Sequence, residues 1–268
     1  MDYIKYIILG IVQGISEPLP VSSSGHIYLF KNLFNTEMFN TFNFEIISNF
    51  GSFLAILFIF RKDIIELIKN FFTFIFSKEK RNSNKNGFMY VIKMIISTIP
   101  VGITGILFND YLESHYNSLK MLGFSFLFTA LMLYIVRNIK GEKDSNGITI
   151  KDAIIIGLFQ AITIIPGISR SGTVLVACLI CKLKREDALK YTFMLYFPVS
   201  LGTMLLKAPE LISTPTSLLL PYLCGMVAAL IITYFSYKWL SNLVKKGKLW
   251  KFSIYCLCLA FFIFIWFR

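Results

Sequence analysis

Residues 13–26 carry side chains that can do chemistry inside an otherwise apolar N-terminal region. Glu17 can bind a divalent cation or act as a base, and His26 can carry a proton. Between them lie three candidate nucleophiles or hydrogen-bond donors, Ser22, Ser23 and Ser24. If a helix begins near Ser22, then Ser22 and Ser23 precede His26 by four and three residues, so either could face it. A carboxylate, hydroxyls and an imidazole at this spacing favour acid–base or nucleophilic catalysis.

A second polar stretch, residues 160–173, places Arg170 deep in an apolar run. A guanidinium there is costly and normally marks a buried pathway or an anionic partner. Its neighbours are hydroxyls and a glycine that let backbone amides approach an anion: Ser169, Ser171, Gly172 and Thr173. A helix starting near Gly172 would point its positive end at the same place. We therefore predict an oxyanion pocket suited to phosphate; a structural pair between Arg170 and Glu17 is a compatible alternative.

The composition predicts an all-α polytopic membrane protein. Apolar residues make up 56% of the 268 residues, the mean hydropathy is +0.66 and charged residues make up 16%. Soluble domains carry about 25% charged residues, and only helices or closed barrels satisfy the backbone in lipid. The net charge of +12 does not indicate nucleic-acid binding, because the basic residues sit between the apolar runs.

The chemistry-bearing stretches interrupt apolar segments that are too short to cross a membrane. Residues 3–13 would form about 16 Å of helix, against a hydrocarbon core of about 30 Å. The same break recurs between residues 150–165 and 173–181, where Pro166 and Gly167 end the first segment. Each broken segment therefore predicts a re-entrant helix hairpin. Six longer runs predict full spans: 42–60, 88–108, 121–136, 188–206, 218–240 and 252–267.

The two broken segments are related by a single offset of 147 residues. Five residues fall on identical partners: Gly10, Gln13, Ser22, Ser24 and Gly25 match Gly157, Gln160, Ser169, Ser171 and Gly172. We therefore expect one integral membrane domain, 1–268, built from two repeats. The first repeat is 1–137, with a basic cytoplasmic insertion at 61–87, and the second is 148–268. Each repeat is predicted to be one re-entrant hairpin and three transmembrane helices.

The basic residues predict how the chain lies in the membrane. Four loops, 61–85, 137–151, 182–190 and 238–251, hold 20 of the 27 Lys and Arg residues. Such loops normally face the cytoplasm, which leaves residues 35–41 on the outer face. The first hairpin then enters from the outer face and the second from the cytoplasm. The halves are predicted to be inverted repeats whose polar loops meet near the membrane midplane.

Three motifs resemble those of the undecaprenyl-diphosphate phosphatase family, also called bacitracin-resistance proteins. They are Gln13-x-x-x-Glu17, Leu19-Pro-x-Ser-Ser-Ser-Gly-His26 and Pro166-Gly-x-Ser-Arg-Ser171. The resemblance covers the whole chain in length and span order. It implies a bacterial plasma-membrane enzyme that removes the terminal phosphate of undecaprenyl diphosphate, which recycles the lipid carrier for peptidoglycan synthesis and confers bacitracin resistance. It also implies a divalent cation, Mg²⁺ or Ca²⁺, and an active site open to the outer face.

The resemblance assigns roles to individual residues. Glu17, Ser23, His26 and Arg170 correspond to catalytic positions, with Glu17 also the metal ligand, while Gln13 and the residues 169–171 correspond to substrate-binding positions. Gln13 stands where many members have glutamate, so the site has one carboxylate and the substrate's phosphates would supply further metal ligands. Pro18 replaces a usual aromatic. Val174 occupies the place of a family threonine, with Thr173 one position early.

Several alternatives stay open at the level of sequence. Ser23 or His26 could attack phosphorus, or His26 could activate a water, and Glu17 could orient His26 instead of holding a metal. Inverted repeats with broken helices also suit a lipid flippase or transporter. A phosphatase of shorter prenyl diphosphates is a second rival. The sequence does not determine the oligomeric state, and a homodimer is one option.

Overall fold

The computed structural model describes residues 2–33, 42–115 and 118–267, and within these ranges the chain is helical with no strand. The predicted outer loop 35–41 lies outside the described residues. The elements run in this order: α1 Asp2–Ser16, α2 Ser23–Leu33, α3 Phe42–Phe76, α4 Arg81–His115, α5 Leu119–Ile135, α6 Ile150–Ile162, α7 Arg170–Ile180, α8 Arg185–Lys207, the 3₁₀ helix η2 Ala208–Ser213, α9 Thr216–Lys245 and α10 Trp250–Trp266.

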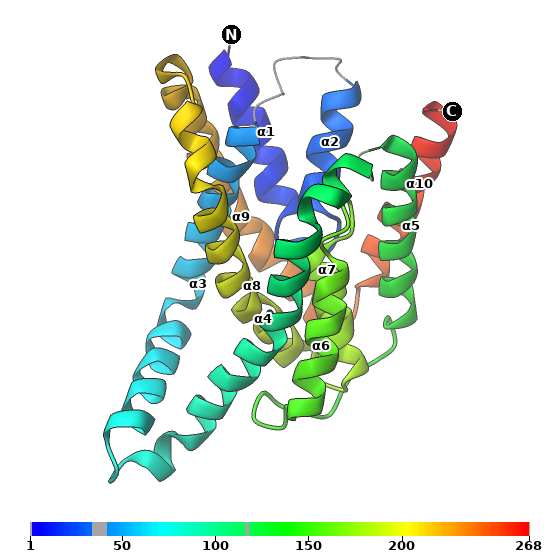
Figure 1. Ribbon diagram of the computed structural model, residues 1–268. Coiled ribbons are helices and arrows are strands. Elements are labelled where there is room, and N and C mark those ends of the chain that lie inside the picture. The colour runs from blue at the N-terminus through cyan, green and yellow to red at the C-terminus, as the bar shows by residue number, and fades with distance from the viewer. Residues whose placement is uncertain (1, 34–41, 116–117, 268) are drawn as a thin grey trace.

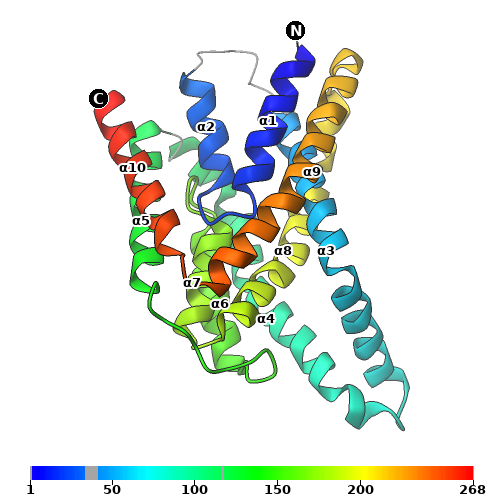
Figure 2. The ribbon, with the colours of Figure 1, turned by 180° about the vertical axis from the view of Figure 1, so that it is seen from behind.

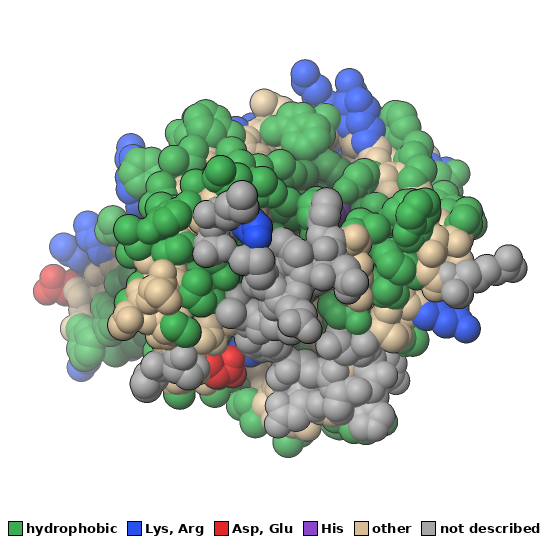
Figure 3. Space-filling view, turned by 90° about the horizontal axis from the view of Figure 1, so that it is seen from above, with side chains coloured by type: hydrophobic (Ala, Val, Ile, Leu, Met, Phe, Trp, Pro, Cys, Tyr) green, Lys and Arg blue, Asp and Glu red, His purple; other side chains and the backbone are tan. Residues whose placement is uncertain are grey.

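Among the described residues, four helices are long and apolar enough to cross a membrane: Asn43–Phe76, Arg81–Phe108, Arg185–Leu211 and Thr216–Lys245. The other two predicted spans, 121–136 and 252–267, correspond to α5 and α10, which have 17 residues each and fall among the shorter apolar helices. Apolar side chains also dominate the perimeter visible from the end that holds both termini (Figure 3). The prediction of an all-helical membrane protein is confirmed.

Two helix pairs carry their connecting loops into the body of the molecule from opposite ends. The hairpin α1–α2 starts and finishes at the end that holds the termini, whereas α6–α7 starts and finishes at the other end (Figures 1 and 2). Pro18 and Pro20 follow the end of α1. Gly167, at φ +87°, makes the corresponding turn after α6. Both polar loops therefore lie well inside the molecule.

The same cap opens α2 and α7. The amide of Gly25 donates to Ser22 Oγ at 3.2 Å, and the amide of Gly172 donates to Ser169 Oγ at 3.1 Å. Both contacts join residues three apart, as in a serine N-cap, and the second recurs 147 residues after the first. The predicted sequence offset therefore corresponds to an equivalent hydrogen bond in the two loops, although Ser22 has φ +68° and Ser169 has φ −70°.

The hairpins are fixed by close packing against long helices. In α1, a Cβ added at Gly10 would lie 2.1 Å from the carbonyl oxygen of Gly225 in α9. In α6, a Cβ added at Gly157 would lie 2.9 Å from the carbonyl oxygen of Ser97 in α4. Since small residues let helix backbones approach closely, these glycines allow each hairpin to pack directly on the backbone of its partner helix. α5 and α10 pack together beside the hairpins (Figure 1).

The predicted basic insertion 61–87 is mostly helical. α3 continues to Phe76 and α4 begins at Arg81, so only residues 77–80 separate them, and the two helices project together from the molecule (Figure 1). Phe88 of α4 stacks on Phe71 and Phe74 of α3, with ring centroids 5.3 and 4.1 Å apart. Aromatic contacts thus extend two membrane helices through a segment that its charges had suggested was a loop.

The Gly10 contact generates a testable prediction. Gly10→Ala should lower the free energy of unfolding by about 1–3 kcal/mol, because the new methyl group overpacks the α1–α9 contact. Thermal unfolding in detergent measures the change. Gly105→Ala is the matched control, since a Cβ there meets nothing within 4 Å and alanine favours a helix. Equal stability of Gly10→Ala and wild type would contradict the packing described.

Candidate active site

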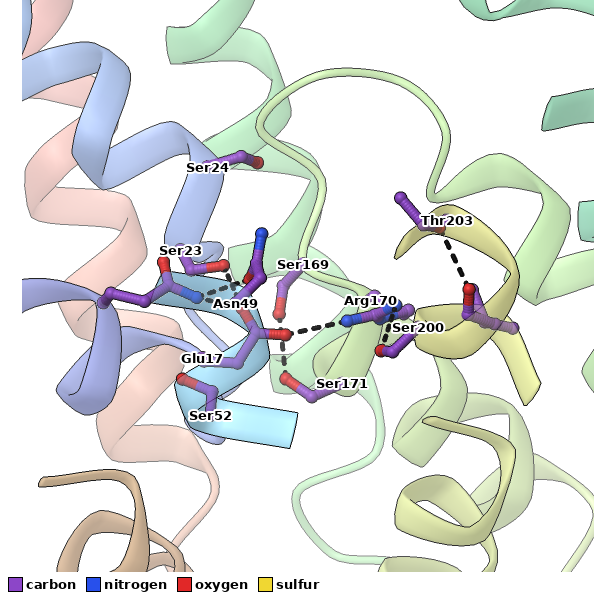
Figure 4. Close-up of polar contacts among 12 residues, drawn as sticks. Glu17, Ser23, Ser24, Asn49, Ser52, Ser169, Arg170, Ser171, Ser200 and Thr203 are labelled. Atoms are coloured by element: carbon purple, nitrogen blue, oxygen red, sulfur yellow. Dashed lines mark hydrogen bonds and ion pairs between the residues drawn. The ribbon is translucent and has the colours of Figure 1, made fainter. Parts of the chain in front are cut away.

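Glu17 is the centre of the polar contacts between the two loops. Its Oε1 accepts from Arg170 Nη2 at 2.7 Å, and its Oε2 accepts from Gln13 Nε2 at 2.9 Å and from Ser23 Oγ at 2.5 Å (Figure 4). The Gln13 amide also donates to Asn49 Oδ1 of α3 at 2.6 Å. Since the Glu17 side chain is only 7% exposed, these contacts replace water for a buried carboxylate.

Arg170 is held by three side chains, one from the first loop and two from α8. Besides its ion pair with Glu17, its Nη1 donates to Ser200 Oγ of α8 at 3.4 Å. Its guanidinium carbon lies 4.6 Å from the centroid of the Tyr196 ring, a cation–π distance. The Arg170 side chain remains 28% exposed, so part of the guanidinium stays open to the adjoining cavity. The predicted pair between the first loop and Arg170 is present.

The second loop is seated directly against the first. Ser171 Oγ donates to the carbonyl of Leu19 at 3.0 Å, and a Cβ at Gly172 would lie 3.1 Å from Pro20. On the other side, Ser125 Oγ of α5 donates to the Pro166 carbonyl at 2.8 Å. These contacts join segments that are 152 residues apart in the sequence. They fix the backbone near Arg170 against the backbone near Glu17, and this places the two side chains within reach of each other.

The structure does not bring His26 to Glu17. Its Nδ1 lies 2.7 Å from the Ser22 carbonyl, and its Nε2 lies 2.7 Å from Tyr255 Oη of α10, whose ring stacks on the imidazole. A carbonyl only accepts, so Nδ1 carries the hydrogen, and in the neutral imidazole Nε2 then accepts from Tyr255. Both ring nitrogens are therefore occupied on the side of α2 that faces α10, away from the Glu17 carboxylate.

The candidate residues differ in whether they line a large cavity of about 670 Å³ beside the loops. Seven of them do: Glu17, Ser22, Ser23, Ser24, Ser169, Arg170 and Ser171. The described residues that line this cavity do not include the other four candidates, Gln13, His26, Gly172 and Thr173. Thr173 is 1% exposed and its Oγ1 has no hydrogen-bond partner, while Gln13 acts through Glu17. The remaining walls come largely from apolar faces of α4 and α8.

Sequence reasoning missed four residues of this site: Asn49, Tyr196, Ser200 and Tyr255. Asn49 gave a usable signal, because it is an amide inside the apolar run of α3, one turn from Glu45. The tyrosines and Ser200 gave none, since aromatic and hydroxyl residues are common in membrane helices for packing alone. Their roles follow only from the tertiary arrangement.

The donor atoms can be tested against the divalent cation that the resemblance implied. Within the described residues, no group of three His, Cys, Asp or Glu side chains could hold a metal ion. Glu17 is the carboxylate at the site, and donors from Arg170, Gln13 and Ser23 occupy both of its oxygens. Mg²⁺ is often held by one or two carboxylates together with substrate phosphates. The donor set fits an ion that shares its ligands with a substrate, not one held by protein alone.

Fold and site together define a helical membrane protein with a polar, anion-directed centre beside an apolar-walled cavity. A family model described as "Bacitracin resistance protein BacA" matches residues 6–262. The chain therefore belongs to the bacitracin resistance protein family. The resemblance drawn from the three sequence motifs is confirmed.

Curated relatives agree with this assignment. The chain is 44% identical over 256 residues to "Undecaprenyl-diphosphatase 2" of Bacillus thuringiensis (strain Al Hakam), covering 95% of this chain and 94% of that one. It is 42% identical over 266 residues to "Undecaprenyl-diphosphatase" of Oceanobacillus iheyensis, with 98% and 96% covered. It is 39% identical over 271 residues to "Undecaprenyl-diphosphatase 1" of Bacillus licheniformis, with 99% of each chain covered.

The Glu17–Arg170 contact can be tested by a double-mutant cycle on stability. Glu17→Gln and Arg170→Met should each lower the free energy of unfolding in mixed micelles, and the double variant should lose less than the sum. We expect a coupling of about 0.5–3 kcal/mol, the range for residues in one network.

The exposed pair Lys245–Glu186, at 3.3 Å, provides the matched control. Its two side chains are 49% and 67% exposed, so Lys245→Met and Glu186→Gln should couple by about 0–1 kcal/mol. Strict additivity at Glu17 and Arg170 would show that the two side chains do not interact in the folded protein.

Proposed function

We propose that this protein hydrolyses undecaprenyl diphosphate to undecaprenyl phosphate and inorganic phosphate. One observation carries the proposal: Ser23 Oγ donates to Glu17, which is paired with Arg170, at the polar end of a cavity with apolar walls. The reaction recycles the lipid carrier for peptidoglycan synthesis, and this links it to bacitracin resistance, for which the family is named. The names of the relatives support the same activity.

The large cavity suits a ligand with a charged head and a long apolar tail. Its polar end holds Arg170 and the serines of both loops. Ile106 of α4 and Leu205 and Leu206 of α8 line its apolar part and are 74%, 69% and 69% exposed, so the walls continue onto the surface of the helices. A prenyl chain could therefore leave the cavity between α4 and α8 and enter the bilayer.

In the first chemical step, Glu17 takes the proton of Ser23 Oγ while this oxygen attacks the terminal phosphorus. The bond between that phosphorus and the bridging oxygen breaks, and the electron pair leaves with undecaprenyl phosphate. Arg170 exchanges its Nη2 contact with Glu17 for the phosphate oxygens, binds them with its fork and stabilises their charge.

In the second step, water hydrolyses the phosphoserine. Glu17, having released its first proton to solvent, takes a proton from the attacking water and passes it to Ser23 Oγ as the phosphorus–oxygen bond breaks. Inorganic phosphate is the product. His26 orients the start of α2 through Ser22 and Tyr255 in this proposal, because both of its nitrogens already have partners.

We propose that the site would hold a divalent cation, Mg²⁺ or Ca²⁺, when the diphosphate is bound. Glu17 would be its protein carboxylate, with the phosphate oxygens as the other charged ligands. When bound, the ion would neutralise developing charge on the departing phosphoryl group. The residues of this chain keep their own roles: Arg170 binds the phosphate, Ser23 attacks and Glu17 moves the proton.

We also infer the membrane arrangement from the two hairpins. Their opposite directions, their repeated serine caps and their equivalent partner helices support an inverted repeat of two re-entrant hairpins and six spans. The basic loops then lie in the cytoplasm, and the end that holds both termini faces outward. In this arrangement the hydrolytic site opens to the outer face of a bacterial plasma membrane.

The proposal predicts phosphate release by the purified protein in detergent. A flippase would release none, and a phosphatase of shorter prenyl diphosphates would prefer shorter chains over the C55 substrate. Arg170→Ala should lower kcat/KM by at least about 10³-fold, the size of effect seen when a transition-state arginine is removed. Arg170→Lys should recover only part of the loss, because it lacks the planar fork.

Arg81→Ala is the control for lost positive charge, since Arg81 starts α4 on the pair of helices that projects from the molecule (Figure 1) and does not line the large cavity. Its rate should match wild type. Near-normal turnover by Arg170→Ala would exclude the phosphate-binding role assigned to this loop.

The nucleophile can be identified by rapid quench with substrate labelled in the terminal phosphate. Label should appear on the peptide that contains Ser23 and be absent from Ser23→Ala. Ser24→Ala is the matched control, because Ser24 lines the same cavity but its hydroxyl contacts Ser22 instead of Glu17. Label on His26, or turnover by Ser23→Ala at the wild-type rate, would refute serine attack.

A further inference from the structure

A second, smaller cavity of about 110 Å³ adjoins Arg170 between α3 and α8. Arg170 lies at one end of its lining, and Lys207, the last residue of α8, lies at the other. Ser200 of α8 and Glu45 and Asn49 of α3 contribute polar side chains between them. Seven residues separate Ser200 from Lys207, or about 10 Å along a helix. The cavity thus runs from the catalytic arginine toward the end of the molecule that holds the termini (Figure 1).

The two cavities lie on opposite faces of α8. Gly202, Leu205 and Leu206 line the large cavity, whereas Ser200 and Lys207 line the small one, and Thr203 lines both. At 3.6 residues per turn, these two sets point to nearly opposite sides of the helix. Figure 4 shows Ser200 directed at Arg170, where both cavities meet. The last two turns of α8 therefore place Leu205 and Leu206 in one cavity and the Lys207 cation in the other.

The two products of the proposed hydrolysis differ in polarity. Undecaprenyl phosphate keeps a long apolar tail, which the large cavity accommodates on the α4 side. Inorganic phosphate is a small, strongly hydrated anion, and leaving through an apolar wall would be costly. Only the smaller cavity offers a second cation beyond Arg170, namely Lys207, among the described residues that line the two cavities.

We propose that this smaller cavity is a binding subsite and exit route for inorganic phosphate, with Arg170 as its inner contact and Lys207 as its outer contact. The proposal rests on the proposed hydrolysis, since that reaction supplies the phosphate. Released phosphate shifts from Arg170 past Ser200 and Asn49 to Lys207, and from there to water on the outer side.

The charges around the cavity suit release more than tight binding. Arg170 and Lys207 attract an anion, while Glu45 lines the same cavity and opposes it, and Glu17 is available to pair again with Arg170. A conducting site has to bind favourably enough for entry and weakly enough for exit. Return of Arg170 to Glu17 would also displace phosphate toward Lys207, since the same guanidinium cannot bind both with its full fork.

The test is inhibition of the purified enzyme by added inorganic phosphate. In Lys207→Met, which keeps the apolar stem and removes the charge, the inhibition constant for phosphate should rise about tenfold, with a smaller change in KM for undecaprenyl diphosphate. Lys207→Arg should restore inhibition. Lys120→Met is the matched control, because Lys120 is the second residue of α5, which starts at the same end of the molecule, but lies outside both described linings.

An equilibrium measurement separates this proposal from the hydrolysis itself. Phosphate should raise the thermal unfolding temperature of wild type and of Lys120→Met more than that of Lys207→Met, whether or not lipid is hydrolysed. If phosphate release from the lipid fails while this difference appears, the proposed function is wrong and the subsite stands. An unchanged inhibition constant and thermal shift in Lys207→Met would overturn the subsite, as would a rise confined to KM.

Discussion

The ion pair between Glu17 and Arg170 is the interaction on which the rest of the site depends. It joins residues 153 positions apart, each on a loop that its own hairpin carries into an apolar interior. Neither charge would be tolerated there without a partner. Gln13 and Ser23 also donate hydrogen bonds to Glu17. Arg170 also contacts Ser200 through a hydrogen bond and the Tyr196 ring through a cation–π interaction. Each half of the chain thus supplies the group that stabilises the charge of the other half.

This pairing also gives the site two states. Without substrate, Arg170 stabilises the Glu17 carboxylate, and with a diphosphate present the guanidinium has a second anion to bind. Glu17 then changes from a paired acceptor into a base next to Ser23 Oγ. The loops do not need to move far for this exchange, because Ser171 already bonds the Leu19 carbonyl and Gly172 packs on Pro20. A rigid backbone can therefore support a switch made only by side chains.

Much of this arrangement could be predicted from the sequence because the signals are local. Prolines, glycines and serines interrupt the apolar runs at both breaks. From these residues we predicted the half-length segments, the 147-residue offset and the contact between the two loops. The continuous helices of α3 and α4 were missed, since seven basic residues suggested a loop whereas Phe71, Phe74 and Phe88 hold the helices together. His26 was expected near Glu17, and Tyr255, 229 residues away, binds it instead. A partner so distant in the sequence cannot be predicted from the residues around His26.

The most direct test is an experimental structure with a non-hydrolysable methylene-bisphosphonate analogue of the lipid diphosphate. The fork of Arg170 should lie on the terminal phosphonate, separated from Glu17, with Ser23 Oγ opposite the bridging carbon and its hydrogen bond to Glu17 retained. The prenyl chain should occupy the large cavity between α4 and α8. A phosphonate bound elsewhere, with the Glu17–Arg170 pair intact, would contradict the account.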